Sequence, residues 1–141
     1  SRGQADESIL SMRVRGFASL IGSRALNAPY EWSAWVNWAL EAGVPQDTVD
    51  AIREGLPPQN LTAEEALITD FCRQLISGNH RVSDKTFNEA RSIFGDRTVV
   101  DLIGSVGYFT MLAMCLNSAE VDLQADRKPP FANVSGYRKT A

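Results

Sequence analysis

The segment from residue 96 to residue 120 most restricts what this chain can fold into. Its sequence, DRTVVDLIGSVGYFTMLAMCLNSAE, is typical of a helix that is apolar nearly all round. Such a helix needs packing partners on every side, so we expect it to be buried at the centre of the fold. The other segments of a 141-residue chain can barely supply those partners. The segment therefore also predicts association between copies of the chain.

Helix signals dominate the rest of the sequence, and no stretch alternates for long with the period of a strand. Pro29 suits a first helical position, Asp47 and Ser83 suit caps, and Thr62 with Glu65 fits a capping box. The predicted fold class is all-α, one domain of about six helices. Before the segment from residue 96, the predicted helices cover residues 6–25, 30–42, 47–55, 62–76 and 83–95.

Glycines are expected to play two roles. Those at the predicted helix ends tolerate the left-handed backbone that stops a helix. Gly16 and Gly22 lie inside the first helix and are expected to weaken it. The helix-stop glycines are Gly43, Gly55, Gly78 and Gly95.

Composition limits the compartment and the partners. A net charge of −3 argues against a nucleic-acid partner, which requires a basic face. No run approaches the ~18 apolar residues of a membrane span, and the first residues show no signal-peptide pattern, so we expect neither a membrane nor a secretory role. Cys72 and Cys115 are far apart and in apolar stretches, as expected of reduced core residues in a cytoplasmic protein. A long-range disulfide between them is the alternative. Because the sequence begins with Ser1 in place of Met, we expect a processed or truncated start. We expect residues 1–123 to form the domain and residues 124–141 to form an extended or disordered tail.

The stretch YEWSAWVNW places Glu31 among tryptophans. Glu31, Trp35 and Trp38 share a helical face, at i, i+4 and i+7. If the rings form a pocket wall, they desolvate the carboxyl, raise its pKa and allow it to exchange a proton near neutral pH. Alternatively, the rings are core and Glu31 faces water at a helix start, where the macrodipole contributes less than ~1 kcal/mol.

Four stretches together resemble the carboxymuconolactone decarboxylase-like family, which includes AhpD-type alkylhydroperoxidases. They span roughly residues 19–123 and keep the family's order and spacing. The resemblance implies an AhpD-like helical bundle that forms homo-oligomers (dimers, trimers or hexamers), with sites near subunit contacts and neither a metal nor an organic cofactor. The stretches are YEWSAWVNWALEAGVPQDTVDAIREG, LTAEEALITDFCRQL, RVSDKTFNEARSIFG and VVDLIGSVGYFTMLAMCLNSAEVDL.

Departures from the family pattern concern the site. Relatives carry a His three residues beyond the Trp of the YEW motif, where this chain has Trp35, and Gly16 fills the slot of an upstream family Glu. Peroxidase members carry a Cys-x-x-Cys pair on the helix that corresponds to residues 30–42, which has no cysteine here. Acid–base chemistry then depends on Glu31, and Trp35 has either removed activity or redirected it.

The predicted site consists of Glu31 as the catalytic acid or base and five residues that bind the substrate. His80 is expected to be an exposed loop residue, and no second His is present to complete a metal site. The predicted binding residues are Tyr30, Trp35, Trp38, Tyr108 and Asn117.

Three functions remain open. The first is a cofactor-independent lyase that acts on a small organic acid or lactone by proton transfer. The second is a non-catalytic oligomer that binds a ligand. The third is an AhpD-like peroxidase, which the missing Cys-x-x-Cys pair disfavours.

Overall fold

The fold is all-α, as the sequence predicts. The computed structural model describes residues 4–119, 123, 126 and 129–131, with side chains from residue 12 onward. Within these residues there are five helices and no strand. The fifth covers the two helices that the sequence separates at Gly95, so the count differs from the expected six. The helices are α1 (Gln4–Ala25), α2 (Pro29–Glu41), α3 (Gln46–Glu54), α4 (Ala63–Ile76) and α5 (Asp84–Ser118).

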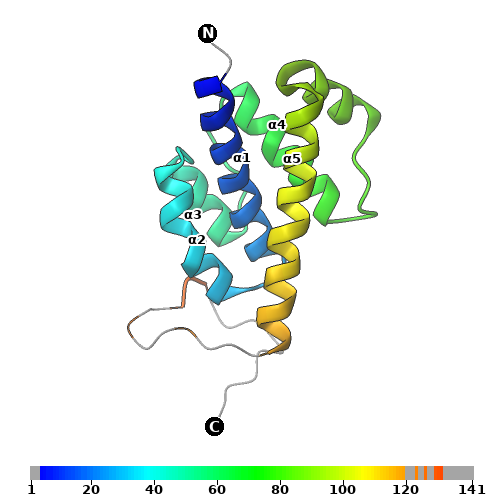
Figure 1. The fold of residues 1–141 in the computed structure, drawn as a ribbon. Helices are drawn as coiled ribbons and strands as arrows, with labels where there is room; N and C mark the ends of the chain where they lie inside the picture. The colour runs from blue at the N-terminus through cyan, green and yellow to red at the C-terminus, as the bar shows by residue number, and fades with distance from the viewer. Residues whose placement is uncertain (1–3, 120–122, 124–125, 127–128, 132–141) are drawn as a thin grey trace.

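The central helix is α1, and the prediction that the last helix is central was wrong. α1 contacts each of the other four helices and lies between α2 and α5 in Figure 1. Phe17 and Leu20 of α1 are fully buried. By contrast, α5 packs on α1, α2 and α4 with one face and leaves another face exposed.

The glycines within α1 allow its neighbours to approach closely. A Cβ at Gly16 would lie 3.0 Å from Cγ2 of Val44 and 3.3 Å from the Cα of Ala39. A Cβ at Gly22 would lie 3.3 Å from Cγ2 of Thr110 on α5. Glycine at these two positions lowers the helix propensity of α1 but allows the neighbouring segments to pack closely against it. The sequence pattern alone does not indicate this close packing.

Most of the predicted helix ends are confirmed. Thr62 accepts a hydrogen bond from the Glu65 N–H while the Glu65 carboxylate accepts one from the Thr62 N–H, which completes the capping box. Ser83 caps α5 by accepting from the N–H of Thr86. The predicted cap at Asp47 was wrong, because the chain already becomes helical after Pro45 and Asp47 lies in the first turn of α3.

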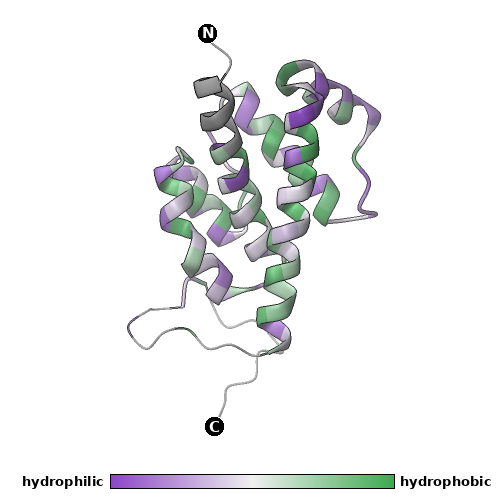
Figure 2. Cartoon of the chain, viewed as in Figure 1, coloured by the Kyte–Doolittle hydropathy of each residue, from purple (hydrophilic) through white to green (hydrophobic). Residues whose placement is uncertain are grey.

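Gly95 interrupts α5, with φ 83° and ψ 162°. Beyond this kink the helix is hydrophobic along much of its length (Figure 2). By length and composition, α5 is apolar enough to cross a membrane, a test that the core helix of a soluble protein also meets. The sequence predicts no apolar run long enough for a membrane span, and α5 differs from that expectation.

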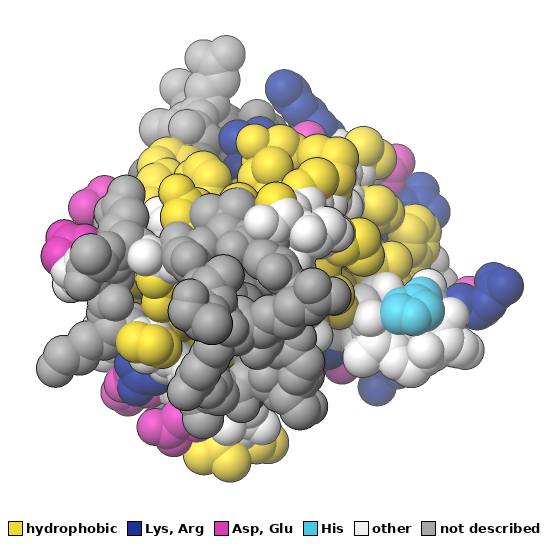
Figure 3. Space-filling view, turned by 90° about the horizontal axis from the view of Figure 1, so that it is seen from below, with side chains coloured by type: hydrophobic (Ala, Val, Ile, Leu, Met, Phe, Trp, Pro, Cys, Tyr) yellow, Lys and Arg dark blue, Asp and Glu magenta, His cyan; other side chains and the backbone are white. Residues whose placement is uncertain are grey.

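The exposed face of α5 carries large apolar side chains at helical spacing. Val100 is 66% exposed, and a hydrophobic band follows one side of the molecule in Figure 3. Gly104 and Gly107 lie on this helix with open space where a Cβ would project. The exposed apolar residues of α5 beyond the kink are Val100, Ile103, Tyr108, Met111 and Met114.

The predicted tail, residues 124–141, lies largely outside the described residues. Residues 129–131, which are described, are not helical. The ring of Phe131 packs edge-on against Trp32, with centroids 5.9 Å apart, and the guanidinium of Arg24 lies 4.8 Å from the centroid of Phe131. This part of the chain therefore packs against α1 and α2.

Candidate functional site

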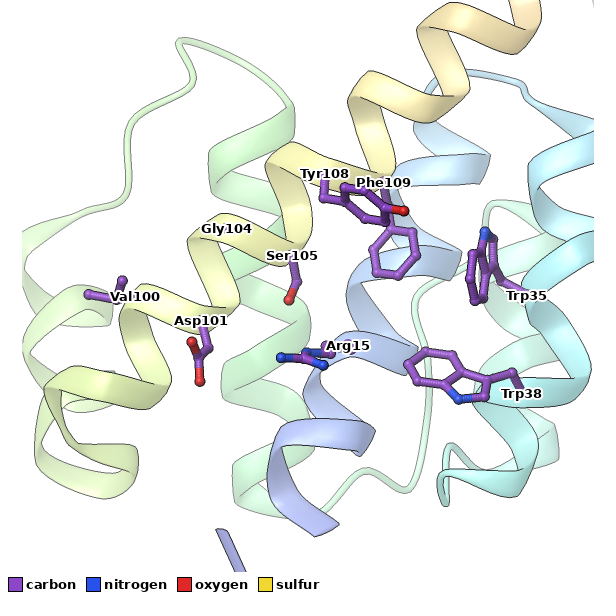
Figure 4. A pocket seen from close by; sticks show the side chains of 9 residues that line it. All are labelled: Arg15, Trp35, Trp38, Val100, Asp101, Gly104, Ser105, Tyr108 and Phe109. Atoms are coloured by element: carbon purple, nitrogen blue, oxygen red, sulfur yellow. The ribbon is translucent and has the colours of Figure 1, made fainter. Parts of the chain in front are cut away.

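A pocket of about 560 Å³ opens between α1, α2 and α5. This volume lies within the range of small-molecule sites, roughly 300–1,000 Å³. Two tryptophans of α2 form one side, the exposed stretch of α5 forms the other, and Arg15 reaches in from α1 (Figure 4). The lining residues are Arg15, Trp35, Trp38, Val100, Asp101, Gly104, Ser105, Tyr108 and Phe109.

The aromatic wall is held together by edge-to-face contacts. Trp35 lies 5.6 Å from Trp38 and 5.3 Å from Phe109, measured between ring centroids, and Tyr108 lies 5.4 Å from Phe109. Such geometry contributes about 0.5–1.5 kcal/mol per pair beyond the area that the rings bury. Because Phe109 is 4% exposed, it anchors the rings to the core. The wall is therefore a preformed apolar surface, suited to a flat ligand.

Four polar groups line the same pocket. Arg15 and Asp101 project into it from the neighbouring helices α1 and α5, and Ser105 and Tyr108 contribute hydroxyls (Figure 4). Within the part of the chain that the structure describes, none of these four side chains makes a hydrogen bond or an ion pair. No described residue therefore competes with a ligand for these four side chains.

Glu31 does not face water. Glu31 lies in the first turn of α2 and is 2% exposed, and its Oε1 has no hydrogen-bond partner among the described residues. Burial raises the pKa of the Glu31 carboxyl above its ordinary value of 4.5, and a hydrogen bond from the Trp35 side chain partly opposes this by favouring the charged form. Desolvation outweighs the Trp35 hydrogen bond, so the net shift of the Glu31 pKa is upward. A carboxyl of this kind holds its proton at higher pH than a glutamate in water.

Glu31 is absent from the lining of the pocket, although the sequence placed it there. Trp35 connects the two, because it lines the pocket and forms the hydrogen bond with Glu31. The tryptophans and the carboxyl are therefore adjacent, with the acid outside the pocket lining.

The other predicted binding residues divide between the pocket and other positions. Tyr108, which is 51% exposed, lines the pocket together with Trp35 and Trp38. Asn117 donates from Nδ2 to the carbonyl of Leu26 at 2.7 Å, which ties the end of α5 to the end of α1. Tyr30 is half-buried at the start of α2 and does not line this pocket.

Sequence reasoning missed both charged residues of the pocket. Asp101 carries the only charge between Arg97 and Glu120, and a lone carboxylate in such an apolar stretch is a signal that could have identified it. Arg15 is less conspicuous, because its segment contains other arginines. Only the packing of α1 beside α5 brings the two into one pocket.

The thiols differ in their surroundings. Cys72 is fully buried on α4, and burial raises its pKa to about 12, so it is a poor nucleophile. Cys115 is exposed on α5, which contradicts its expected core position. Both are free, so the disulfide alternative is not realised.

His80 is exposed in the loop between α4 and α5, as expected, and is the single histidine of the chain (cyan in Figure 3). Across the described ranges, no group of three His, Cys, Asp or Glu side chains is arranged to hold a metal ion. No protein-family model, curated protein or solved structure matches the chain.

Proposed function

We propose that this protein is a cofactor-independent enzyme of the carboxymuconolactone decarboxylase-like type, which moves a proton on a small organic acid or lactone. The burial of Glu31 carries the proposal, because a carboxyl inside a fold with one oxygen left without a described partner costs stability, and such groups concentrate at functional sites. A raised pKa also suits a general acid that operates near neutral pH.

The proton transfer has a simple balance. In a decarboxylation, the bond between the substrate carbon and its carboxylate breaks, carbon dioxide leaves, and the electron pair stays on carbon. The protonated Glu31 then gives its proton to that carbon and recovers one from water. The aromatic wall would favour a carbanion whose charge is spread over an unsaturated ring, because the rings replace water along one face of the bound molecule.

Access to the acid depends on Trp35. Because this side chain lines the pocket and hydrogen-bonds with Glu31, its rotation would bring a bound substrate and the carboxyl together. The hydrogen bond would break in the same movement, and the charged form of Glu31 would lose a stabilising contact.

The test compares two conservative variants. A panel of unsaturated lactones and carboxylic acids is incubated in heavy water, and carbon dioxide release and deuterium incorporation are followed by NMR. Glu31→Gln should lower the rate about 10²- to 10⁴-fold, the usual contribution of a general acid. Glu65→Gln changes another buried glutamate, which caps α4, and should leave the rate unchanged because Gln preserves a capping box. Equal rates for wild type and Glu31→Gln would reject the proposal.

One observation favours the second candidate, a ligand-binding protein without catalysis. Glu31 does not line the pocket, so a ligand can occupy the aromatic wall without touching it. This alternative predicts that the panel contains compounds that bind and are recovered unchanged, with equal affinity for wild type and Glu31→Gln.

We also propose that the protein functions as a homo-oligomer in contact through the exposed face of α5. Val100, Met111 and Met114 repeat at helical spacing, whereas soluble monomers rarely leave a large apolar patch open. Gly104 and Gly107 would allow the backbone of a second helix to approach. Because Val100 and Gly104 also line the pocket, the contact would lie beside the site.

A further inference from the structure

The pocket is lined by one positively charged and one negatively charged side chain that do not form an ion pair with each other. Arg15 on α1 and Asp101 on α5 both project into the cavity, and no ion pair within 4.0 Å joins them in the described part of the chain. In the view of Figure 4, the Arg15 guanidinium lies between Asp101 and Trp38. A ligand that enters the pocket therefore meets a cation, an anion and an aromatic wall together.

A ligand with one kind of charge satisfies only part of this arrangement. A plain carboxylate would gain Arg15 but would lie near the Asp101 carboxylate, which repels it. A plain amine would gain Asp101 and the ring faces, which attract cations, but would be repelled by Arg15. A neutral ring would leave both charged groups without partners in a partly dehydrated pocket.

From this we infer that the pocket binds a zwitterion with a flat apolar body, of which an amino acid with an aromatic side chain is the simplest example. The ligand carboxylate pairs with Arg15, whose planar fork suits a bidentate contact. The ligand ammonium pairs with Asp101, and the Ser105 and Tyr108 hydroxyls lie in the same lining as further hydrogen-bond groups. The flat body packs on Trp35, Trp38 and Phe109. This inference goes beyond the proposed function, because it holds whether or not Glu31 transfers a proton.

Three related probes separate the contributions of the two charges. L-phenylalanine carries both charges, 3-phenylpropionate lacks the ammonium, and 2-phenylethylamine lacks the carboxylate. Binding is measured by calorimetry and by tryptophan fluorescence, since Trp35 and Trp38 lie in the pocket. L-phenylalanine should bind about tenfold more tightly than either of the others, the factor expected for one charge-assisted contact.

Two variants assign each charge to its partner. Arg15→Gln should weaken L-phenylalanine and 3-phenylpropionate about tenfold and leave 2-phenylethylamine unaffected or tighter. Asp101→Asn should weaken L-phenylalanine and 2-phenylethylamine and leave 3-phenylpropionate unaffected or tighter. Arg91→Gln is the matched control, because Arg91 is an exposed arginine on α5 outside the pocket, 2.7 Å from Asp96. Arg15 is exposed and Asp101 half-exposed, so melting temperatures should stay close to that of wild type.

Several results would overturn the inference. One is the absence of binding by all three probes, and another is binding of either singly charged probe as tight as that of L-phenylalanine. A third is unchanged L-phenylalanine affinity in Arg15→Gln or Asp101→Asn, the result expected if the two side chains only pair with each other across the pocket. Glu31→Gln should bind L-phenylalanine normally, so failure of this inference is distinguishable from failure of the proposed proton transfer.

Discussion

Replacing Glu31 by Gln should change how stability depends on pH. Well below pH 4.5 the Glu31 carboxyl is protonated in both the folded and the unfolded state and adds no pH dependence. Between 4.5 and the raised pKa of the folded state, the unfolded chain loses the proton while the fold keeps it. The unfolded state then binds fewer protons, so the stability of the wild type falls as pH rises, by up to about 1.36 kcal/mol per pH unit. Above the folded pKa both states are ionised and the loss stays constant.

The Gln side chain does not titrate, so the difference between variant and wild type isolates Glu31. At low pH the variant should be the less stable, because its buried amide brings additional donors without partners, a cost of about 1–3 kcal/mol. As pH rises above 4.5, the wild type loses stability and the difference should shift in favour of Gln. Urea unfolding followed by far-ultraviolet circular dichroism, at a series of pH values on both sides of 4.5, measures this shift.

A control of opposite sign is available at Asp96. The hydrogen bond and the charge of Arg91 hold the pKa of the Asp96 carboxyl below its ordinary value of 3.8. Any stability from this pair is present above pH 3.8 and is lost as pH falls through the folded pKa, so Asp96→Asn should be slightly less stable above pH 3.8. The effect should be small because the pair is exposed.

Parallel curves for wild type and Glu31→Gln across the whole pH range would refute the reasoning on Glu31.

Three further predictions concern packing, thiols and assembly. Gly16→Ala should destabilise the fold, because overpacking costs about 1–3 kcal/mol and the gain in helix propensity is about 1 kcal/mol. Gly107→Ala meets open space within the single chain, so it should stabilise the dissociated chain by up to about 1 kcal/mol. Equal urea midpoints for the two variants, measured at a protein concentration that keeps the chain monomeric, would contradict this. A thiol reagent should label Cys115 in the folded protein and Cys72 only after denaturation, and labelling of both at the same rate would count against the burial of Cys72. Peroxide consumption with a dithiol reductant should be negligible. Sedimentation should give a mass above that of the monomer for wild type and a mass closer to the monomer for Met111→Glu, and a monomeric wild type at every concentration would rule out the proposed contact.

Helix ends were predictable because their causes are local. The Thr62 and Glu65 capping box and the left-handed Gly55 depend on residues within one turn, so the sequence contains all the information needed. Asp47 failed as a cap because Pro45 is equally compatible with a helix start and comes earlier.

The arrangement of the helices and the composition of the pocket were less predictable. An apolar count shows that α5 needs partners but not which partners the chain itself provides, so its exposed face was mistaken for core. Gly16 was interpreted as a weak point, whereas its missing side chain allows α2 to approach α1. Arg15 and Asp101 are distant in sequence and share a pocket only because α1 packs against α5.

In the proposed function, Glu31 is a buried acid coupled to the pocket through Trp35. The most direct measurement is an NMR pH titration of the Glu31 carboxyl carbon, assigned by its absence in Glu31→Gln. The expected midpoint lies above 4.5, because desolvation by burial favours the protonated form. In Trp35→Phe the midpoint should rise further, because the variant keeps a ring but loses the hydrogen bond that favours the charged form. A wild-type midpoint at or below 4.5, unchanged in Trp35→Phe, would contradict the account.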